Sequence, residues 1–285
     1  MKPDVLYVSD LDGTLLQDDA TLSPRGRALL TELLDDGVPF TVASARSIGS
    51  MGPILQGLDL SLPVIEFNGA FLSDLSTGEH LWVNDIRQPV LGSVYETICS
   101  HGLAPFVSTY DGCADRLYAP PATHAGMRWY LDDRLAAGDQ RLRQVEDVSV
   151  GLAQQVVCLT VIDREEVIEP LAEQLATLGD AIDVSFWDNS YSPGWFWVSI
   201  HDGRATKDLA VRMLLEHAGL GDVEIVAFGD QANDIAMIRA AHRGVAVANA
   251  IAEVRAVADE IIGPNTDDSV LLYVHADWQT RRSGL

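Results

Sequence analysis

Two aspartates one residue apart, Asp10 and Asp12, follow a short apolar run near the start of the chain. Carboxylates this close repel each other, and both stay ionised only beside a cation or strong hydrogen-bond donors. Mg²⁺ is such a cation, because it takes hard oxygen ligands and leaves positions for water and phosphate oxygens. Gly13 lets the backbone turn after the pair, and Thr14 adds a hydroxyl group. The stretch predicts a Mg²⁺-assisted phosphate site, with an ordinary Asx turn as the alternative.

Polar clusters follow two further apolar runs, at residues 38–43 and 224–228, so three predicted strands end in this way. Each run reads as a strand buried on both faces, as in the interior of a parallel sheet. The carboxyl ends of parallel strands meet at one edge, which is where open α/β sheets bind ligands. The polar residues at the three ends are Asp10, Asp12, Thr14, Ser44, Arg46, Asp230, Asn233 and Asp234.

Each of these residues also has an ordinary structural explanation when it is taken alone. Asp230 could cap a helix, and Asn233 and Ser44 could be turn residues. Lys207 could be a solvated lysine at a helix start, but only one other lysine, Lys2, occurs in a chain of formal net charge −23. Together, several acids for Mg²⁺, hydroxyl and amide donors, and one cation favour a phosphoryl-transfer site.

The order of helices and strands predicts an α/β fold with an insertion. Strands and helices alternate over residues 1–85 and 202–285, which predicts a Rossmann-like, doubly wound parallel sheet. In the first part we expect strands at 5–8, 38–43 and 64–67, with Asn68-Gly69 closing the third in a turn. Between 86 and 201, paired strands mix with helices, including a hairpin connected by Asn189 to Gly194. This segment predicts an inserted α+β domain with an antiparallel sheet.

Composition limits the partners of the protein. The net charge of −23 argues against nucleic-acid and anionic-membrane partners, whereas a small phosphorylated metabolite needs only local positive charge. No apolar run approaches 18 residues, and the N-terminus lacks the regions of a signal peptide. The three cysteines show no metal-ligand spacing, and we expect mostly buried, reduced thiols. We therefore expect a soluble cytoplasmic protein, as a monomer or a homodimer.

The ordered motifs resemble those of the haloacid dehalogenase (HAD) superfamily. They are Asp-x-Asp-Gly-Thr-Leu at residues 10–15, Ser44, Lys207, and Gly-Asp-x-x-Asn-Asp at residues 229–234. More narrowly, the chain is similar to the Cof-type phosphatases, which carry a large (C2-type) cap domain between the second and third motifs. Phe67 to Ala70 and Asn249-Ala250 resemble lesser landmarks of that group, whereas Ala45 and Gln231 depart from it.

This resemblance implies a Mg²⁺-dependent phosphoric monoester hydrolase with defined residue roles. Asp10 would attack phosphorus to form an aspartyl-phosphate, and Asp12 would act as general acid and base. The Asp10 side chain, the Asp12 backbone carbonyl and Asp230 would hold Mg²⁺, while Asp234 orients the metal's waters or Lys207. The phosphate-binding residues would be Thr14, Ser44, Lys207 and Asn233. Arg46 and Asn68 would either bind substrate or hold a loop.

Several functions remain open at this point. The leading expectation is hydrolysis of a small phosphorylated metabolite, a sugar phosphate, with the cap domain closing over the site and selecting the leaving group. The alternatives are a phosphomutase or phosphotransferase on the same scaffold, and a non-catalytic sensor of phosphate ligands. The tryptophans of the insertion either stack on a sugar or belong to its core.

Overall fold

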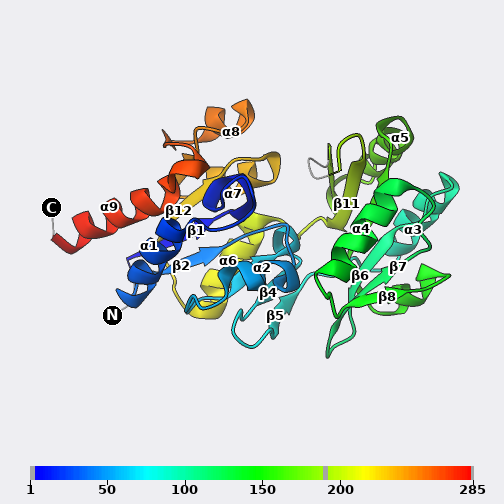
Figure 1. Cartoon of the computed structure of the whole chain (residues 1–285), viewed down its shortest axis with the longest axis horizontal. Coiled ribbons are helices and arrows are strands. Elements are labelled where there is room, and N and C mark those ends of the chain that lie inside the picture. The colour runs from blue at the N-terminus through cyan, green and yellow to red at the C-terminus, as the bar shows by residue number, and fades with distance from the viewer. Residues whose placement is uncertain (1–3, 189–191, 284–285) are drawn as a thin grey trace. The chain divides into compact units, whose positions relative to one another are not determined.

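The computed structural model describes residues 4–188 and 192–283, which form two compact units (Figure 1). The first unit runs up to Trp82 and resumes at Thr206, and the second is Val83–Ala205. The boundaries predicted from the sequence lie between residues 85 and 86 and between residues 201 and 202. The first unit carries all the residues proposed for the site.

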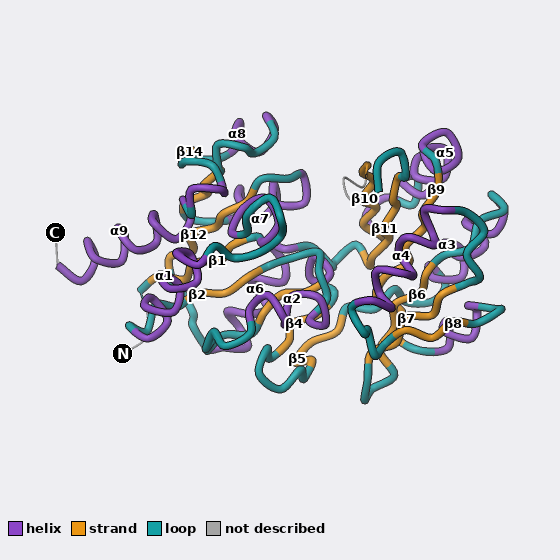
Figure 2. Tube along the Cα trace, viewed as in Figure 1, coloured by secondary structure: helices purple, strands orange, loops and turns teal. Residues whose placement is uncertain are grey.

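A five-stranded sheet forms the centre of the first unit, in the order β14-β13-β12-β1-β2, and all its pairs are parallel. Figure 2 shows β1 between β12 and β2. The strands are β1 (Val5–Ser9), β2 (Phe40–Val42), β12 (Glu224–Gly229), β13 (Arg243–Ala246) and β14 (Glu260–Ile261). Because the strands run in the same direction, the carboxyl ends of β1, β2 and β12 lie at one edge.

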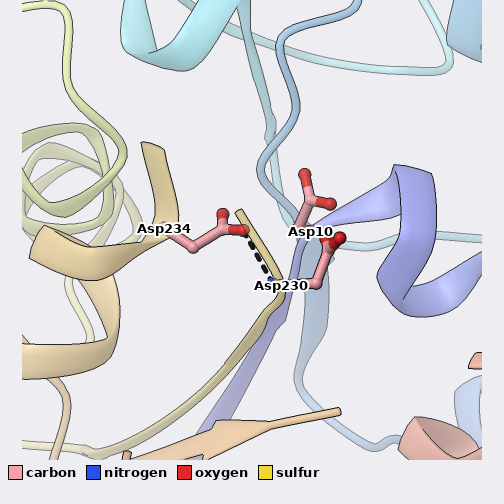
Figure 3. A group of neighbouring side chains, drawn as sticks. All are labelled: Asp10, Asp230 and Asp234. Atoms are coloured by element: carbon pink, nitrogen blue, oxygen red, sulfur yellow. Dashed lines mark hydrogen bonds between the residues drawn. The ribbon is translucent and has the colours of Figure 1, made fainter. Parts of the chain in front are cut away.

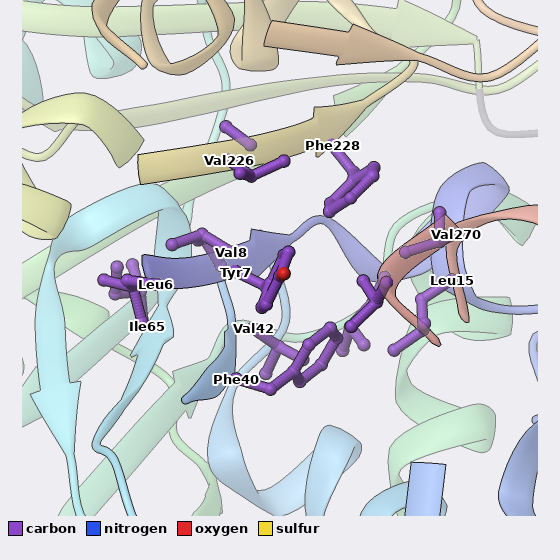
Figure 4. Packing of buried hydrophobic residues seen from close by; sticks show 14 of the residues in the cluster. Leu6, Tyr7, Val8, Leu15, Phe40, Val42, Ile65, Val226, Phe228 and Val270 are labelled. Atoms are coloured by element: carbon purple, nitrogen blue, oxygen red, sulfur yellow. The ribbon is translucent and has the colours of Figure 1, made fainter. Parts of the chain in front are cut away.

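Every residue of β1 is buried, as expected for a strand covered on both faces. Tyr7 points to the face that carries α9 (Ser269–Ser283), where its hydroxyl donates to Asp277 at 2.6 Å. Leu6 and Val8 point to the opposite face (Figure 4). Burying a side chain of this size contributes roughly 1.5–3 kcal/mol, so β1 is a rigid base for the residues that follow it.

Two helices of the first unit begin or end at residues that suit those positions. In α1 (Pro24–Asp35), Ser23 Oγ accepts a hydrogen bond from the Gly26 backbone N–H at 2.8 Å, and proline occupies the first turn. In α6 (Lys207–Ala218), Gly219 ends the helix in the left-handed conformation (φ +62°). The remaining helices are α2 (Ile48–Leu55), α7 (Ile235–Ala240) and α8 (Ala252–Val257).

The third strand departs from the prediction. β3 (Val64–Glu66) forms a separate three-stranded sheet with β4 (Phe71–Ser73) and β5 (His80–Val83), and its strand pairing with the end of β2 is a single parallel bridge between Ala43 and Ile65. The turn predicted at Asn68-Gly69 is present, and Phe67 and Asn68 both adopt positive φ there. This turn reverses the chain, so β4 pairs antiparallel with β3. β4 and β5 were not predicted from the sequence.

The second unit contains a six-stranded sheet in the order β10-β11-β9-β6-β7-β8, in which only the β7–β8 pair is parallel. The strands are β6 (Phe106–Tyr110), β7 (Asp115–Ala119), β8 (Leu142–Gln144), β9 (Gln155–Asp163), β10 (Ile182–Asp188) and β11 (Phe196–Asp202). The helices are α3 (Val90–Ser100), α4 (Ala125–Ala136) and α5 (Glu165–Ala176). The predicted fold class, a parallel α/β core with an inserted α+β domain, is confirmed.

The hairpin expected near the end of the insertion is present as β10 and β11, which pair antiparallel. Its expected connection, Asn189 to Gly194, begins with residues 189–191, which lie outside the described part. Trp129, Trp195 and Trp197 pack against a cluster of buried side chains that includes Tyr130, which favours a role in the core of the unit.

Two expectations about composition can be compared with the structure. Cys99 and Cys113 are exposed and only Cys158 is buried, so the expectation of mostly buried thiols is wrong. Among residues 4–188 and 192–283, no helix is both long enough and apolar enough to span a membrane.

Candidate active site

Asp10 is held where β1 ends. Its backbone N–H donates to the Phe228 carbonyl at 3.0 Å, and only 6% of the residue is exposed. The chain then turns at Gly13, which has a φ of +72°. A Cβ at this position would lie 2.5 Å from Asp230 Oδ2, so both the backbone angle and the space require glycine.

Lys207, the first residue of α6, is 1% exposed and joins two of the acids. Its Nζ donates to Asp10 Oδ1 and to Asp234 Oδ1, both at 2.6 Å. Burial opposes the charged ammonium, but the negative charges of Asp10 and Asp234 outweigh it and raise the pKa of Lys207 above its usual value. This lysine is a fixed, charged group of the site.

The loop after β12 is built around the Asp234 carboxylate. Asp234 Oδ2 accepts hydrogen bonds from the backbone N–H groups of Asp230, at 2.9 Å, and Gln231, at 3.0 Å. The Asp230 carboxylate accepts from Thr14 Oγ1 at 2.8 Å and from Gln231 Nε2 at 3.0 Å. Both carboxylate oxygens of Asp234 therefore accept hydrogen bonds within the protein, one of them from the charged Lys207. Among the residues that the structure describes, the Asp230 carboxylate accepts only from two uncharged side chains.

Asp10, Asp230 and Asp234 form a buried acidic cluster, each with a carboxylate oxygen within 4.8 Å of the others (Figure 3). Burial raises the pKa of Asp10 well above its usual value although Lys207 opposes the shift, and burial raises the pKa of Asp230 to about 6. Three carboxylates share one ammonium group, so the cluster holds excess negative charge in a poorly solvated place. Such a donor set fits a hard divalent cation, with Asp10 and Asp230 as the available side-chain ligands.

Asp12 is paired with Arg46 from the loop after β2. Arg46 Nε donates to Asp12 Oδ2 at 2.7 Å, and Nη2 donates to Oδ1 at 2.6 Å, so the contact is bidentate. The Asp12 side chain is 44% exposed and the Arg46 side chain 23%. The second acid of the pair is thus kept apart from the buried cluster and has a cation of its own.

The other predicted phosphate and substrate residues are also linked. Ser44 Oγ accepts from the Arg46 backbone N–H at 3.1 Å, which leaves its own proton available for another acceptor. The Ser44 carbonyl accepts from the Asn68 N–H at 2.9 Å. The Asn68 side-chain oxygen in turn accepts from Asn233 Nδ2 at 2.9 Å. Asn68 therefore links the loop after β2 to the amide of Asn233.

The structure brings the predicted residues into three connected groups at the carboxyl edge of the sheet. The buried group consists of Asp10, Lys207, Asp234, Asp230 and Thr14. The second group is the pair of Asp12 and Arg46. In the third group, Asn68 is hydrogen-bonded to both Ser44 and Asn233. Thr14, predicted to bind phosphate, donates its hydroxyl proton to Asp230. It does so because the turn at Gly13 brings the two side chains together.

Two contacts of the site were missed. Gln231 was noted only as a departure from the motif, yet its side chain binds Asp230. Asn249 Nδ2 donates to the Gly13 carbonyl at 2.7 Å and so supports the turn beside Asp10. Asn249 comes shortly after β13, so the rule that polar residues cluster at strand ends could have identified it.

Comparison with known proteins agrees with this geometry. Residues 7–274 match the family of haloacid dehalogenase-like hydrolases. The chain belongs to this family. The predicted resemblance is therefore confirmed, and the Asp10 turn and the Asp230 to Asp234 loop both lie within the matched segment.

Two relatives of this HAD-like hydrolase, each matched over nearly its whole length, are named phosphatases. It is 27% identical over 281 residues to the 5-amino-6-(5-phospho-D-ribitylamino)uracil phosphatase YitU of Bacillus subtilis, with 94% of this chain and 96% of the relative covered. It is 28% identical over 271 residues to the pyridoxal phosphate phosphatase YbhA of Escherichia coli, with the same coverage of 94% and 96%. The predicted enzyme class, phosphoric monoester hydrolase, is confirmed.

The fold has close counterparts among solved structures. A haloacid dehalogenase-like hydrolase from Bacteroides thetaiotaomicron superimposes with a TM-score of 0.78 at 24% identity, covering 97% of this chain and all of the other. At this identity the likeness shows the fold alone.

Proposed function

We propose that this HAD-like hydrolase is a Mg²⁺-dependent phosphatase that cleaves a small phosphorylated metabolite through an aspartyl-phosphate at Asp10. The observation that carries the proposal is the buried cluster in which Lys207 Nζ bridges Asp10 and Asp234 beside Asp230. A dianionic phosphate cannot approach three carboxylates unless positive charge offsets the repulsion. Lys207 supplies one positive charge, and a divalent cation would supply the rest.

The reaction proceeds in two displacements. In the first, an Asp10 carboxylate oxygen bonds to phosphorus, the bond from phosphorus to the ester oxygen breaks, and that oxygen takes the proton of Asp12. In the second, water attacks the phosphorus of the aspartyl-phosphate and gives a proton to Asp12. The bond between phosphorus and the Asp10 oxygen breaks, inorganic phosphate leaves, and both aspartates return to their starting states.

Each other residue of the site has a place in this scheme. Asp10 and Asp230, with the backbone carbonyl of Asp12, would hold Mg²⁺, which offsets the charge of the phosphoryl oxygens when bound. Lys207 stays charged beside the nucleophile, and Ser44 and Asn233 donate to phosphate oxygens. Asp234 holds Lys207 and the loop after β12 in place.

The names of two relatives and the net charge of the chain support the proposed substrate class. YitU and YbhA are named for small phosphorylated metabolites, and the net charge of −23 disfavours nucleic acids. A sugar phosphate fits the same class. Transfer of the phosphoryl group to a second sugar, as in a phosphomutase, uses the same two aspartates, and product analysis separates it from hydrolysis.

The test is phosphate release from a panel of sugar phosphates, nucleotides and pyridoxal phosphate, with Mg²⁺ and with EDTA. We expect Mg²⁺-dependent release that Asp10→Asn abolishes. Asp35→Asn is the matched control, because Asp35 is exposed at the end of α1 and the chemical change is the same. If the folded, Mg²⁺-loaded protein released phosphate from no ester, the proposal would be wrong. An isomerised sugar phosphate without free phosphate would identify a mutase.

A further inference from the structure

The ion pair between Arg46 and Asp12 has no role in the two displacements proposed above. Its two hydrogen bonds, of 2.7 and 2.6 Å, join the Nε and Nη2 donors of one guanidinium to the two oxygens of one carboxylate. Such a fork fixes both the position and the plane of the carboxylate, which a single hydrogen bond does not.

The backbone of Arg46 is itself held on both sides. Its N–H donates to Ser44 Oγ at 3.1 Å, and its carbonyl accepts from the Phe67 N–H at 3.1 Å. The loop after β2 is therefore a firm support for the guanidinium. The Asp12 side chain is 44% exposed, so its own surroundings restrain it less.

We propose that Arg46 is a positioning residue, which sets the Asp12 carboxylate for proton transfer to the leaving oxygen and does not bind the substrate phosphate. This inference rests on the proposed function, since it concerns the residue that exchanges the proton. Each of the two catalytic aspartates then has a cationic partner of its own. Lys207 serves the nucleophile Asp10, and Arg46 serves the proton donor Asp12.

Removal of Arg46 should impair only the steps that need Asp12. Cleavage of an alkyl phosphate needs a proton on the leaving oxygen, because an alkoxide is a poor leaving group. A p-nitrophenolate ion leaves without that proton. The decrease in rate caused by the loss of Arg46 should therefore depend on the leaving group. The loss of a phosphate-binding arginine would instead slow the cleavage of both esters alike.

The experiment measures the first turnover of hexose 6-phosphate and of p-nitrophenyl phosphate with Mg²⁺ in the full chain. We expect Arg46→Ala to slow the first turnover of the sugar phosphate by about 10²-fold, the lower end of the usual effect of general acid catalysis. We expect it to change the first release of p-nitrophenol by less than about threefold. The KM of the first turnover, which is the substrate concentration that gives half its maximal rate, should change by a similarly small factor.

Two further variants test whether the geometry of the contact matters and whether Arg46 acts through Asp12. Arg46→Lys keeps the positive charge but lacks the fork, so we expect it to restore little of the sugar-phosphate rate. In an Asp12→Asn background, Arg46→Ala should cause no further loss, because both changes remove the same function. Arg141→Ala is the matched control, since Arg141 makes the same bidentate contact with Asp139 in the second unit.

The outcomes are distinct. Equal losses for both esters, a KM increase as the main effect, or full rescue by Arg46→Lys would overturn the inference and leave the phosphatase intact. Additive losses in the double variant would also overturn it. Failure of the wild-type protein to release product from either ester would contradict the proposed function, and with it the inference.

Discussion

Lys207 Nζ lies 2.6 Å from Asp10 Oδ1, although 197 positions separate the two residues in the chain. The contact forms because β1, an interior strand of the sheet, ends at Ser9, and α6 begins with Lys207 where the chain returns to the first unit. The ammonium opposes the rise in the pKa of Asp10 that burial causes, and so favours the ionised carboxylate that the proposed nucleophilic attack requires.

Replacement of Lys207 by methionine tests this pairing in the metal-free protein. Lys207→Met leaves Asp10 and Asp234 without their shared cation, so we expect the free energy of unfolding to fall by about 3 kcal/mol. The measurement is urea unfolding in EDTA. Because Asp234→Asn removes one of the charges left unpaired, the double variant should lose less stability than the sum of the single losses. Additive losses would show that the two residues do not stabilise each other.

Gly13 offers a test of the space beside Asp230. A Cβ at Gly13 would lie 2.5 Å from Asp230 Oδ2, so Gly13→Ala should move a proposed metal ligand and weaken Mg²⁺ binding at least tenfold. Isothermal titration with Mg²⁺ measures the effect. Gly37→Ala is the control, because Gly37 has a similar φ of +80° but nothing within 4 Å of the added atom. Both variants should lose about 1 kcal/mol to backbone strain, and only the first should lose Mg²⁺ affinity.

The place of the candidate site could be predicted from the sequence, whereas several contacts within it and some of the strands could not. Asp10, Ser44 and Asp230 are polar residues at the ends of predicted strands. Their place at one edge of the sheet could be predicted without any structure, because the carboxyl ends of parallel strands must meet. The pairing of Arg46 with Asp12 could not be predicted, since it depends on side-chain directions in two loops. β4 was missed for a related reason, because a positive φ at two residues that are not glycine, Phe67 and Asn68, reverses the chain there.

Asp277 makes the stability of the first unit sensitive to acid. It accepts hydrogen bonds from Tyr7 at 2.6 Å and from Arg243 and Arg281 at 2.8 Å. Burial opposes its charge, but these donors lower the pKa of Asp277 to about 2. An unfolded aspartate titrates at about 3.9, so the folded state binds its proton less readily. The stabilisation is complete above pH 4 and is lost as the pH falls towards 2.

Asp277→Asn should remove this contribution. We expect a loss of about 1 kcal/mol in the free energy of unfolding at pH 7, a modest value because solvent partly screens the ion pairs. The difference between variant and wild type should shrink as the pH is lowered from 4 to 2. Urea unfolding at several pH values measures it, with Asp35→Asn as the control. A difference that stayed constant with pH would contradict the assignment.

Asn68 provides a test of whether it binds substrate or orients its neighbour. Asn68→Gly keeps the left-handed backbone (φ +58°) but removes the oxygen that holds Asn233 Nδ2 at 2.9 Å. If Asn233 donates to the phosphate, its amide loses its orientation, and we expect KM to rise about fivefold to tenfold with little change in kcat. Asn68→Ala should raise KM equally but also lower the free energy of unfolding by about 1 kcal/mol, because alanine is strained at this φ. Steady-state kinetics in the Asn233→Ala background completes the test: an orienting Asn68 has no further effect on KM there, whereas an Asn68 that binds substrate itself raises KM in both backgrounds.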